Sequence, residues 1–141
     1  MTIQKSKTTK KMFDENPELW YQYHDKRDFS FRGYDKQEEI PINKIIAYLE
    51  MKSNKKLKIL DLGCGRNLIK KYFENNKNLE IIGYDHVSYN ESIACDISKL
   101  PDNNETINIC VFSQSLMGSN WKDYILEAFR VLIYNDLEKA Q

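Results

Sequence analysis

Apolar residues follow a helical spacing in three segments of the chain. The first, residues 42–51, comes directly after Pro41, a residue suited to the first turn of a helix. The others are residues 68–74 and 121–137. The positions expected to face inward are Ile42, Ile45, Ile46 and Leu49, then Leu68, Ile69, Tyr72 and Phe73, and finally Tyr124, Ile125, Ala128, Phe129 and Leu132. The pattern predicts one amphipathic helix in each segment.

Short apolar segments beside these helices are typical of buried strands. They are residues 56–62, 79–84, 92–95 and 106–113. Helix-length or loop crossovers separate them, which favours parallel pairing with right-handed connections. The pattern therefore predicts one α/β layer sandwich, without internal repeats and without linkers long enough to divide domains.

The N-terminal residues have a different composition. Residues 1–12 carry four lysines and no periodic apolar pattern, so we expect a disordered basic tail, with a weak RNA-tethering arm as the functional alternative. Aromatic side chains are dense from residue 13 onward, as in a lid packed on the core or a surface that stacks on a base. We expect one domain over residues 13–141, with a lid and helix over 13–52 and a ligand-binding α/β core over 56–137.

Composition excludes several classes of protein. The chain has 141 residues, 41% of them hydrophobic, and equal numbers of basic and acidic residues, so it is not a generic nucleic-acid coat. No apolar run approaches the roughly 18 residues of a membrane span, and the polar N-terminus lacks a signal-peptide core, so we expect a soluble intracellular protein. Three cysteines without a C-x-x-C spacing, and only two histidines, argue against a metal site and a disulfide framework.

A glycine-rich turn with a leading aspartate carries the clearest chemistry. Asp61-Leu62-Gly63-Cys64-Gly65 ends the first strand and precedes a helix. Glycines permit positive φ angles and let the backbone approach a ligand closely. Position 68 is Leu rather than the third glycine of a pyrophosphate-binding loop, whereas Asn67 tolerates a left-handed conformation. The turn therefore predicts a ligand site that differs from a dinucleotide site.

Two further acidic residues end the next strands. Asp85 lies twenty residues after Gly65, and Asp96 lies eleven residues after Asp85. Open α/β sheets bind ligands at the carboxyl ends of their strands. Asp85 is placed to accept hydrogen bonds from ribose hydroxyls, and Asp96 from the amino group of adenine. Because carboxylates suit a cation, the pattern predicts an S-adenosylmethionine site, with the amino-acid and sulfonium end near Asp61 and Gly63.

A longer motif resembles one family. The segments F-S-Q-S-L-M-G-S-N-W at residues 112–121 and E-A-F-R-V-L at residues 127–132 look like those of the nucleomethylin, or ribosomal RNA-processing protein 8, family of methyltransferases. Tyr23-His24, D-L-G-C-G, Tyr84-Asp85 and Ala94-Cys95-Asp96-Ile97 match other family motifs in the same order. The resemblance covers about residues 13–133.

The resemblance implies a Rossmann-like class I methyltransferase, a three-layer α/β sandwich, that methylates N1 of an adenine in large-subunit ribosomal RNA in the nucleolus. Residues 13–141 would then be the methyltransferase-like domain. The cofactor contacts that carry over are His24, Gly63, Asp85, Asp96, Ile97 and Ser113, to which the turn adds Asp61, Cys64 and Gly65. No catalytic residue is assigned, and the candidates for the base pocket, which follow the fourth strand, are Ser115, Met117, Ser119 and Asn120.

After Leu132 the sequence departs from the family pattern, because the Gly-Gly turn that leads into a fifth strand is missing. We expect a parallel sheet truncated after the fourth strand, in the order 3-2-1-4, with the apolar fourth strand as an unprotected edge. Such an edge invites pairing with another chain, so a homo-oligomer is one outcome. A fragment is another, and a third is a cofactor-binding scaffold or sensor in a nucleolar or chromatin assembly. A methyltransferase with a protein or small-molecule acceptor also stays open.

Overall fold

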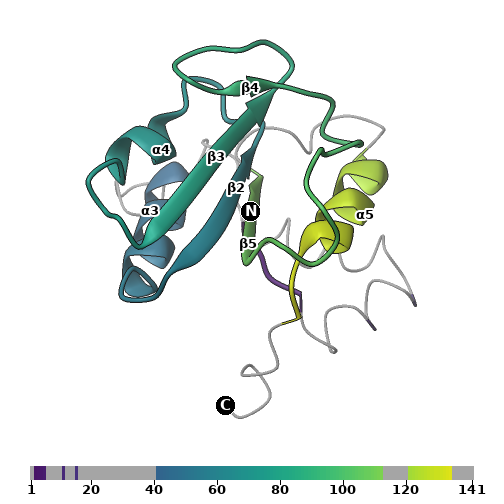
Figure 1. The fold of residues 1–141 in the computed structure, drawn as a ribbon, viewed down its shortest axis with the longest axis horizontal. Helices are drawn as coiled ribbons and strands as arrows, with labels where there is room; N and C mark the ends of the chain where they lie inside the picture. Colours follow the sequence, from purple (N-terminus) through teal and green to yellow (C-terminus); the bar gives the residue numbers. More distant parts are fainter. Residues whose placement is uncertain (1, 6–10, 12–14, 16–40, 113–120, 135–141) are drawn as a thin grey trace.

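A computed structural model describes residues 2–5, 11, 15, 41–112 and 121–134, and its centre is a five-stranded sheet (Figure 1). The strands are β1 (Thr2–Ile3), β2 (Leu57–Leu62), β3 (Leu79–Asp85), β4 (Ile93–Ala94) and β5 (Ile109–Phe112), and the helices are α3 (Pro41–Met51), α4 (Leu68–Tyr72) and α5 (Trp121–Val131). The spatial order of the strands is β1-β5-β2-β3-β4. All pairs are parallel except that of β1 with β5.

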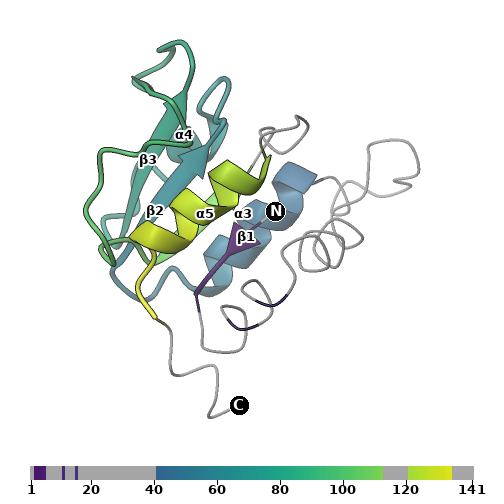
Figure 2. The ribbon, with the colours of Figure 1, turned by 90° about the vertical axis from the view of Figure 1, so that its right-hand side faces the viewer.

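The helices cover both faces of the sheet, with α5 on one face and α3 and α4 on the other (Figures 1 and 2). Alternate residues of β2 serve the two layers, since Leu60 and Leu62 pack in the cluster that contains α5, whereas Ile59 packs in the cluster that contains α3 and α4. Every residue of β5 is buried. Burial on both faces explains why the central strands have continuous apolar runs rather than alternating ones. The predicted α/β three-layer sandwich is confirmed.

The last helix is shorter than predicted. The amphipathic pattern predicts a helix over residues 121–137, but α5 ends at Val131 and Leu132 forms a parallel bridge with Ile107. The amide of Ile133 donates to the carbonyl oxygen of Ile107 at 2.8 Å. Pairing with the sheet therefore replaces the helical continuation, and residues 135–137 lie outside the described ranges.

The predicted disordered tail is wrong for residues 2–5. Thr2 pairs with Val111 and Ile3 with Cys110 in antiparallel register, and the Ile3 side chain is only 1% exposed. The buried Lys5 ammonium donates to the carbonyl oxygen of Phe129, in the last turn of α5, at 2.8 Å. A cation near unpaired helix-end carbonyls is a favourable cap. The lysines that predict disorder thus include one that holds the segment in place.

The predicted unprotected edge is also wrong. The expected fourth strand corresponds to β5, and β1 pairs with its outer edge, so the sheet is neither four-stranded nor wholly parallel. An edge that is already paired offers fewer free amide and carbonyl groups to a second chain. β1 pairs with Cys110 and Val111 of this edge, and the homo-oligomer stays a prediction.

A charged clamp holds the segment after β4 against α5. The Glu127 carboxylate accepts hydrogen bonds from the Leu100 amide at 2.6 Å and from Arg130 Nε at 2.6 Å. The Arg130 guanidinium also donates to the Leu100 carbonyl oxygen at 3.0 Å and to Asn104 Oδ1 at 2.7 Å. The hydrogen bond from Arg130 is the main cause that lowers the pKa of Glu127. The clamp fixes both backbone groups of Leu100.

Removal of the buried side chain of β1 is expected to destabilise the fold. Ile3→Ala should lower the free energy of unfolding by about 2–4 kcal/mol, the usual cost of emptying a fully buried aliphatic site. Urea unfolding measures the loss, with Thr2→Ala, a partly exposed position of the same strand, as the control. A loss no larger than that of the control would contradict the placement of β1 in the core.

The clamp predicts a pH-dependent stability difference. Glu127→Gln should destabilise the chain by about 1–3 kcal/mol at pH 7, because charge-assisted hydrogen bonds are lost. The folded pKa of Glu127 is lowered, so its contribution is present above the unfolded pKa of about 4.3 and is lost as the pH falls through the folded value. Urea unfolding from pH 7 to about 3.5 should show the wild-type advantage shrink.

Glu80→Gln is the matched control for this clamp, because Glu80 pairs with Lys58 at 3.8 Å with both side chains exposed. An exposed pair of that kind contributes about 0–1 kcal/mol. An equal effect of the two variants at pH 7, or a Glu127→Gln difference that grows in acid, would contradict the clamp.

Candidate cofactor site

The glycine-rich turn reverses the chain between β2 and α4. Gly63 has φ 77°, Gly65 has φ 53° and Asn67 has φ 59°, so the left-handed conformation is used at all three positions. The amides of Gly63 and Cys64 donate to the Tyr84 carbonyl oxygen at 2.8 and 3.2 Å. The predicted strand-turn-helix is confirmed, including the left-handed Asn67. The hydrogen bonds to Tyr84 attach the backbone of the glycine turn to the end of β3.

Asp85, at the end of β3, binds the turn directly. Its Oδ2 accepts a hydrogen bond from the Gly65 amide at 2.8 Å, and its Oδ1 accepts one from the His86 amide at 2.7 Å. A carboxylate has about four acceptor positions, so these contacts leave capacity for a ligand. The side chain that was predicted to hold a ribose is therefore also the side chain that orients the glycine turn.

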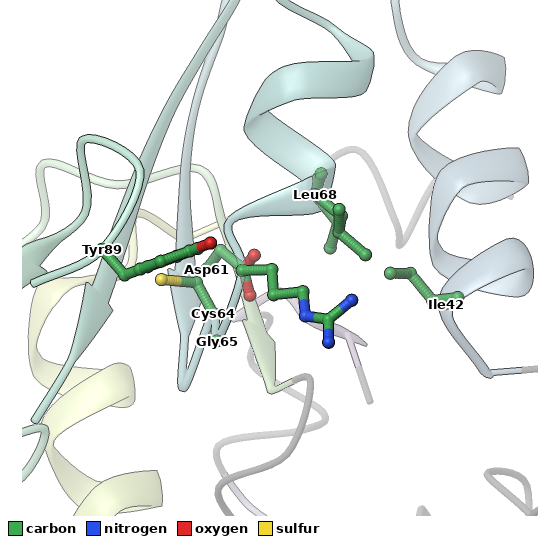
Figure 3. A pocket seen from close by; sticks show the side chains of 8 residues that line it. Ile42, Asp61, Cys64, Gly65, Leu68 and Tyr89 are labelled. Atoms are coloured by element: carbon green, nitrogen blue, oxygen red, sulfur yellow. The ribbon is translucent and has the colours of Figure 1, made fainter. Parts of the chain in front are cut away.

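A cavity of about 640 Å³ opens beside this turn (Figure 3). In Figure 3, Tyr89 lies on one side of it and Ile42 and Leu68 lie on the other, with Asp61 between them. The Asp61 residue is only 1% exposed, so a carboxyl group is buried at the cavity wall. The lining comprises Ile42, Asp61, Cys64, Gly65, Arg66, Leu68, Ile69 and Tyr89. Ligand sites commonly have volumes of about 300–1,000 Å³.

The Cys64 thiol in this lining is not set up as a nucleophile. Its pKa is raised to about 11, mainly by burial and to a smaller extent by the neighbouring Asp61. A thiol with such a pKa stays protonated at neutral pH. Cys64 therefore serves packing, since its side chain lies against the glycine of β3.

Asp96 and Ile97 lie farther along the same edge of the sheet. Asp85 pairs with Ala94, and Asp96 follows two residues later as an exposed side chain. The amide and hydroxyl of Ser98 donate to Asp96 Oδ1 at 2.9 and 2.7 Å, and these hydrogen bonds lower the pKa of Asp96. The Ile97 side chain is buried in the core, so a ligand here would meet its backbone.

The predicted residues thus fall into four groups. Asp61, Gly65 and Cys64 line the cavity, and Gly63 and Asp85 hold the turn that forms its wall. Among the described residues, the cavity lining includes none of Gly63, Asp85, Asp96 and Ile97, and their contacts with a cofactor stay predictions. The remaining predicted residues lie outside the described ranges and also stay predictions: His24, Ser113, Ser115, Met117, Ser119 and Asn120.

Sequence reasoning did not identify Arg66 and Tyr89 as site residues. Tyr89 lies in the segment H-V-S-Y-N-E-S directly after Asp85, and an aromatic residue in so polar a loop is the signal that was available. In the described ranges, no three His, Cys, Asp or Glu residues are grouped to hold a metal ion. Within the same ranges, no helix has the length and apolar character needed to cross a membrane.

The comparisons with known proteins agree with this geometry. A family model described as "Hypothetical methyltransferase" matches residues 1–139. The chain is 39% identical over 129 residues to the 25S rRNA (adenine(645)-N(1))-methyltransferase of Schizosaccharomyces pombe, and the match covers 86% of this chain and 40% of the relative. It is 38% identical over 138 residues to ribosomal RNA-processing protein 8 of Dictyostelium discoideum, and this match covers 95% of the chain and 33% of the relative.

A solved structure has a similar fold. It is the 1,6-didemethyltoxoflavin-N1-methyltransferase of Burkholderia thailandensis, with a TM-score of 0.55 at 19% identity, over 83% of this chain and 56% of the other. An identity of 19% establishes the fold alone. The curated relatives are much longer than the matched region, because the chain spans only 40% and 33% of the length of the two named above. The chain belongs to the methyltransferase family of the ribosomal RNA-processing proteins 8, with the Rossmann-like α/β fold of class I methyltransferases.

Proposed function

We propose that this chain is an S-adenosylmethionine-dependent methyltransferase that acts on N1 of an adenine in ribosomal RNA. The observation that carries the proposal is the Asp85 carboxylate, which holds the Gly65 amide beside a cavity with the buried Asp61 in its wall. The relative from S. pombe is named for adenine-N1 methylation of 25S rRNA, which supports both the reaction and the substrate class. The chain's relatives named ribosomal RNA-processing protein 8 support a nuclear or nucleolar location.

The donor set fits S-adenosylmethionine. The cofactor has an ammonium group, a sulfonium centre and a carboxylate, and the cavity lining offers an acidic residue, Asp61, and a basic residue, Arg66. Asp85 has acceptor positions left for ribose hydroxyls, and the lowered pKa of Asp96 keeps that carboxylate ionised for an adenine amino group. The structurally similar Burkholderia enzyme was solved with bound S-adenosylhomocysteine, which supports the same cofactor class.

The reaction asks for positioning rather than proton transfer. Bound S-adenosylmethionine supplies an electrophilic methyl group, and adenine N1 has an in-plane lone pair that needs no deprotonation before attack. The chain contributes by orienting both reactants and excluding water. The raised pKa of Cys64 agrees with this, because no thiolate is required beside the cofactor.

The target base must be unpaired or flipped, since N1 of a paired adenine is blocked. We assign the base pocket to Ser115, Met117, Ser119 and Asn120, which follow β5 in the sequence. Ser113 and His24 complete the proposed cofactor contacts. These six residues lie outside the described ranges, so the assignment depends on their family motifs and on the end of β5 beside β2.

Loss of the Asp85 carboxylate should weaken cofactor binding. Asp85→Ala is expected to raise the Kd for S-adenosylhomocysteine by about 5- to 150-fold, equivalent to about 1–3 kcal/mol for lost charge-assisted hydrogen bonds. Titration calorimetry on the folded variant measures the change. Asp102→Ala is the matched control, because Asp102 accepts a hydrogen bond from the Tyr84 hydroxyl at 2.7 Å and belongs to no proposed cofactor contact. Equal affinities of the two variants would contradict the pocket.

Methyl transfer tests the activity itself. The wild-type chain should transfer labelled methyl groups from S-adenosylmethionine to unmethylated large-subunit ribosomal RNA, and nucleoside analysis should identify the product as 1-methyladenosine. Asp85→Ala should reduce the rate by about 5- to 150-fold when the cofactor concentration is below the wild-type Kd. Intact cofactor binding without transfer would instead support a binding module. Labelled protein or small molecules from a lysate would assign another class of acceptor.

A further inference from the structure

Two asparagines join the glycine turn to the loop of residues 86–92. Asn67 is 2% exposed, and its side-chain Nδ2 donates to the Asn90 carbonyl oxygen at 2.9 Å. In return, the Asn90 Nδ2 donates to the Arg66 carbonyl oxygen at 3.2 Å. We call this reciprocal pair the asparagine latch. It connects two segments that β3 and α4 separate along the chain.

Asn67 fits this place closely. A Cβ atom added to Gly83 of β3 would lie 2.3 Å from Asn67 Oδ1 and 2.8 Å from Cys64 Sγ. The missing side chain at position 83 therefore lets the Asn67 amide lie directly against the strand. Asn67 Oδ1 is buried and has no hydrogen-bond partner among the described residues, which is an energetic cost for a polar atom. A side chain kept in place at that cost calls for a compensating role.

The loop that Asn67 holds has a defined internal turn. The Tyr89 amide donates to Ser92 Oγ at 2.8 Å, and the Ser92 amide donates to the Tyr89 carbonyl oxygen at 3.1 Å. Asn90 and Glu91 have φ angles of 50° and 70°. These contacts set the shape of the loop, but they do not connect it to the glycine turn. The latch adds a connection through the part-buried hydrogen bond from Asn67 to Asn90, beside a side-chain hydrogen bond between Cys64 and Ser92.

The loop carries one wall of the cavity. Tyr89 lies opposite Ile42 and Leu68 in Figure 3, and its side chain lines the cavity although the residue is 57% exposed. An exposed aromatic ring needs a fixed backbone to keep one orientation. Glu91 forms an ion pair with Lys70 at 3.9 Å, but both groups are exposed to solvent. Such a pair contributes little to fixing the backbone of the loop.

We propose that Asn67 is a positioning residue of the cofactor site, which holds the 86–92 loop through the asparagine latch so that Tyr89 forms a wall of the cavity. This assignment rests on the proposed function, because it treats the cavity as the cofactor site. Asn67 touches no reacting atom. It acts on the cofactor through Tyr89.

The test separates the side chain of Asn67 from its backbone conformation. Asn67→Gly keeps the left-handed φ without strain and removes the amide. Asn78→Gly is the control, since Asn78 Nδ2 donates to the Ser53 carbonyl oxygen at 3.1 Å, before the start of β3 rather than at its carboxyl end. Hydrogen–deuterium exchange without ligand should show faster exchange in residues 86–92 for Asn67→Gly alone. Equal exchange in the two variants would overturn the latch.

Cofactor affinity then tests the role of the latch in binding. Asn67→Gly should raise the Kd for S-adenosylhomocysteine by about two- to tenfold, the equivalent of one hydrogen bond, and Asn78→Gly should leave it unchanged. Tyr89→Ala should also weaken binding. In the double variant the two effects should not add, because the latch acts through Tyr89, whereas full additivity would overturn the assignment. A purely structural role would lower stability without such coupling.

The proposed function and the latch fail in different ways. A folded wild-type chain that binds neither S-adenosylmethionine nor S-adenosylhomocysteine overturns the proposed function and the binding role of Asn67 together. Normal binding by the wild type and by Asn67→Gly, with Asp85→Ala impaired, overturns the positioning role alone. Calorimetry on these three chains under one set of conditions distinguishes the outcomes.

Discussion

The site depends on a sharp reversal of the backbone between β2 and α4. The chain must turn from a buried strand into a helix within a few residues, and the left-handed conformation at Gly63, Gly65 and Asn67 makes this possible. A reversal of this kind exposes amide groups that need acceptors. The Tyr84 carbonyl oxygen and the Asp85 carboxylate provide them, so the end of β3 is as much a part of the turn as the glycines are.

This constraint gathers negative charge at one edge of the sheet. Asp61, Asp85 and Asp96 lie at or near the carboxyl ends of successive parallel strands, and Asp61 is buried beside the cavity. Two of the carboxylates have a structural role, since Asp85 accepts a hydrogen bond from the glycine turn and Asp96 accepts one from Ser98. A substitution at either position therefore changes the local backbone as well as the proposed ligand contact.

The parts of this arrangement that the sequence predicts are local ones. The runs of β2, β3 and β5 are long and apolar enough to be recognised, and the D-L-G-C-G turn identifies itself by its glycines and its place after a strand. β1 was missed because two residues have no measurable periodicity, and its burial depends on β5, which is far away in sequence. The end of α5 was misplaced for a related reason, because sheet pairing by Leu132 overrides the helical pattern.

Long-range contacts also explain a motif whose purpose the sequence does not disclose. In E-A-F-R-V-L, Glu127 and Arg130 form hydrogen bonds with the backbone of Leu100, which lies in the same loop as Asp96. The apolar residues Ala128, Val131 and Leu132 are buried in the core cluster that contains α5. The motif is therefore architectural, although it follows the predicted base-pocket residues in the sequence. Family resemblance in this chain combines residues that face a ligand with residues that hold the loops around it. Only the three-dimensional contacts reveal the second kind, since Asp85 holds the glycine turn and Glu127 holds Leu100.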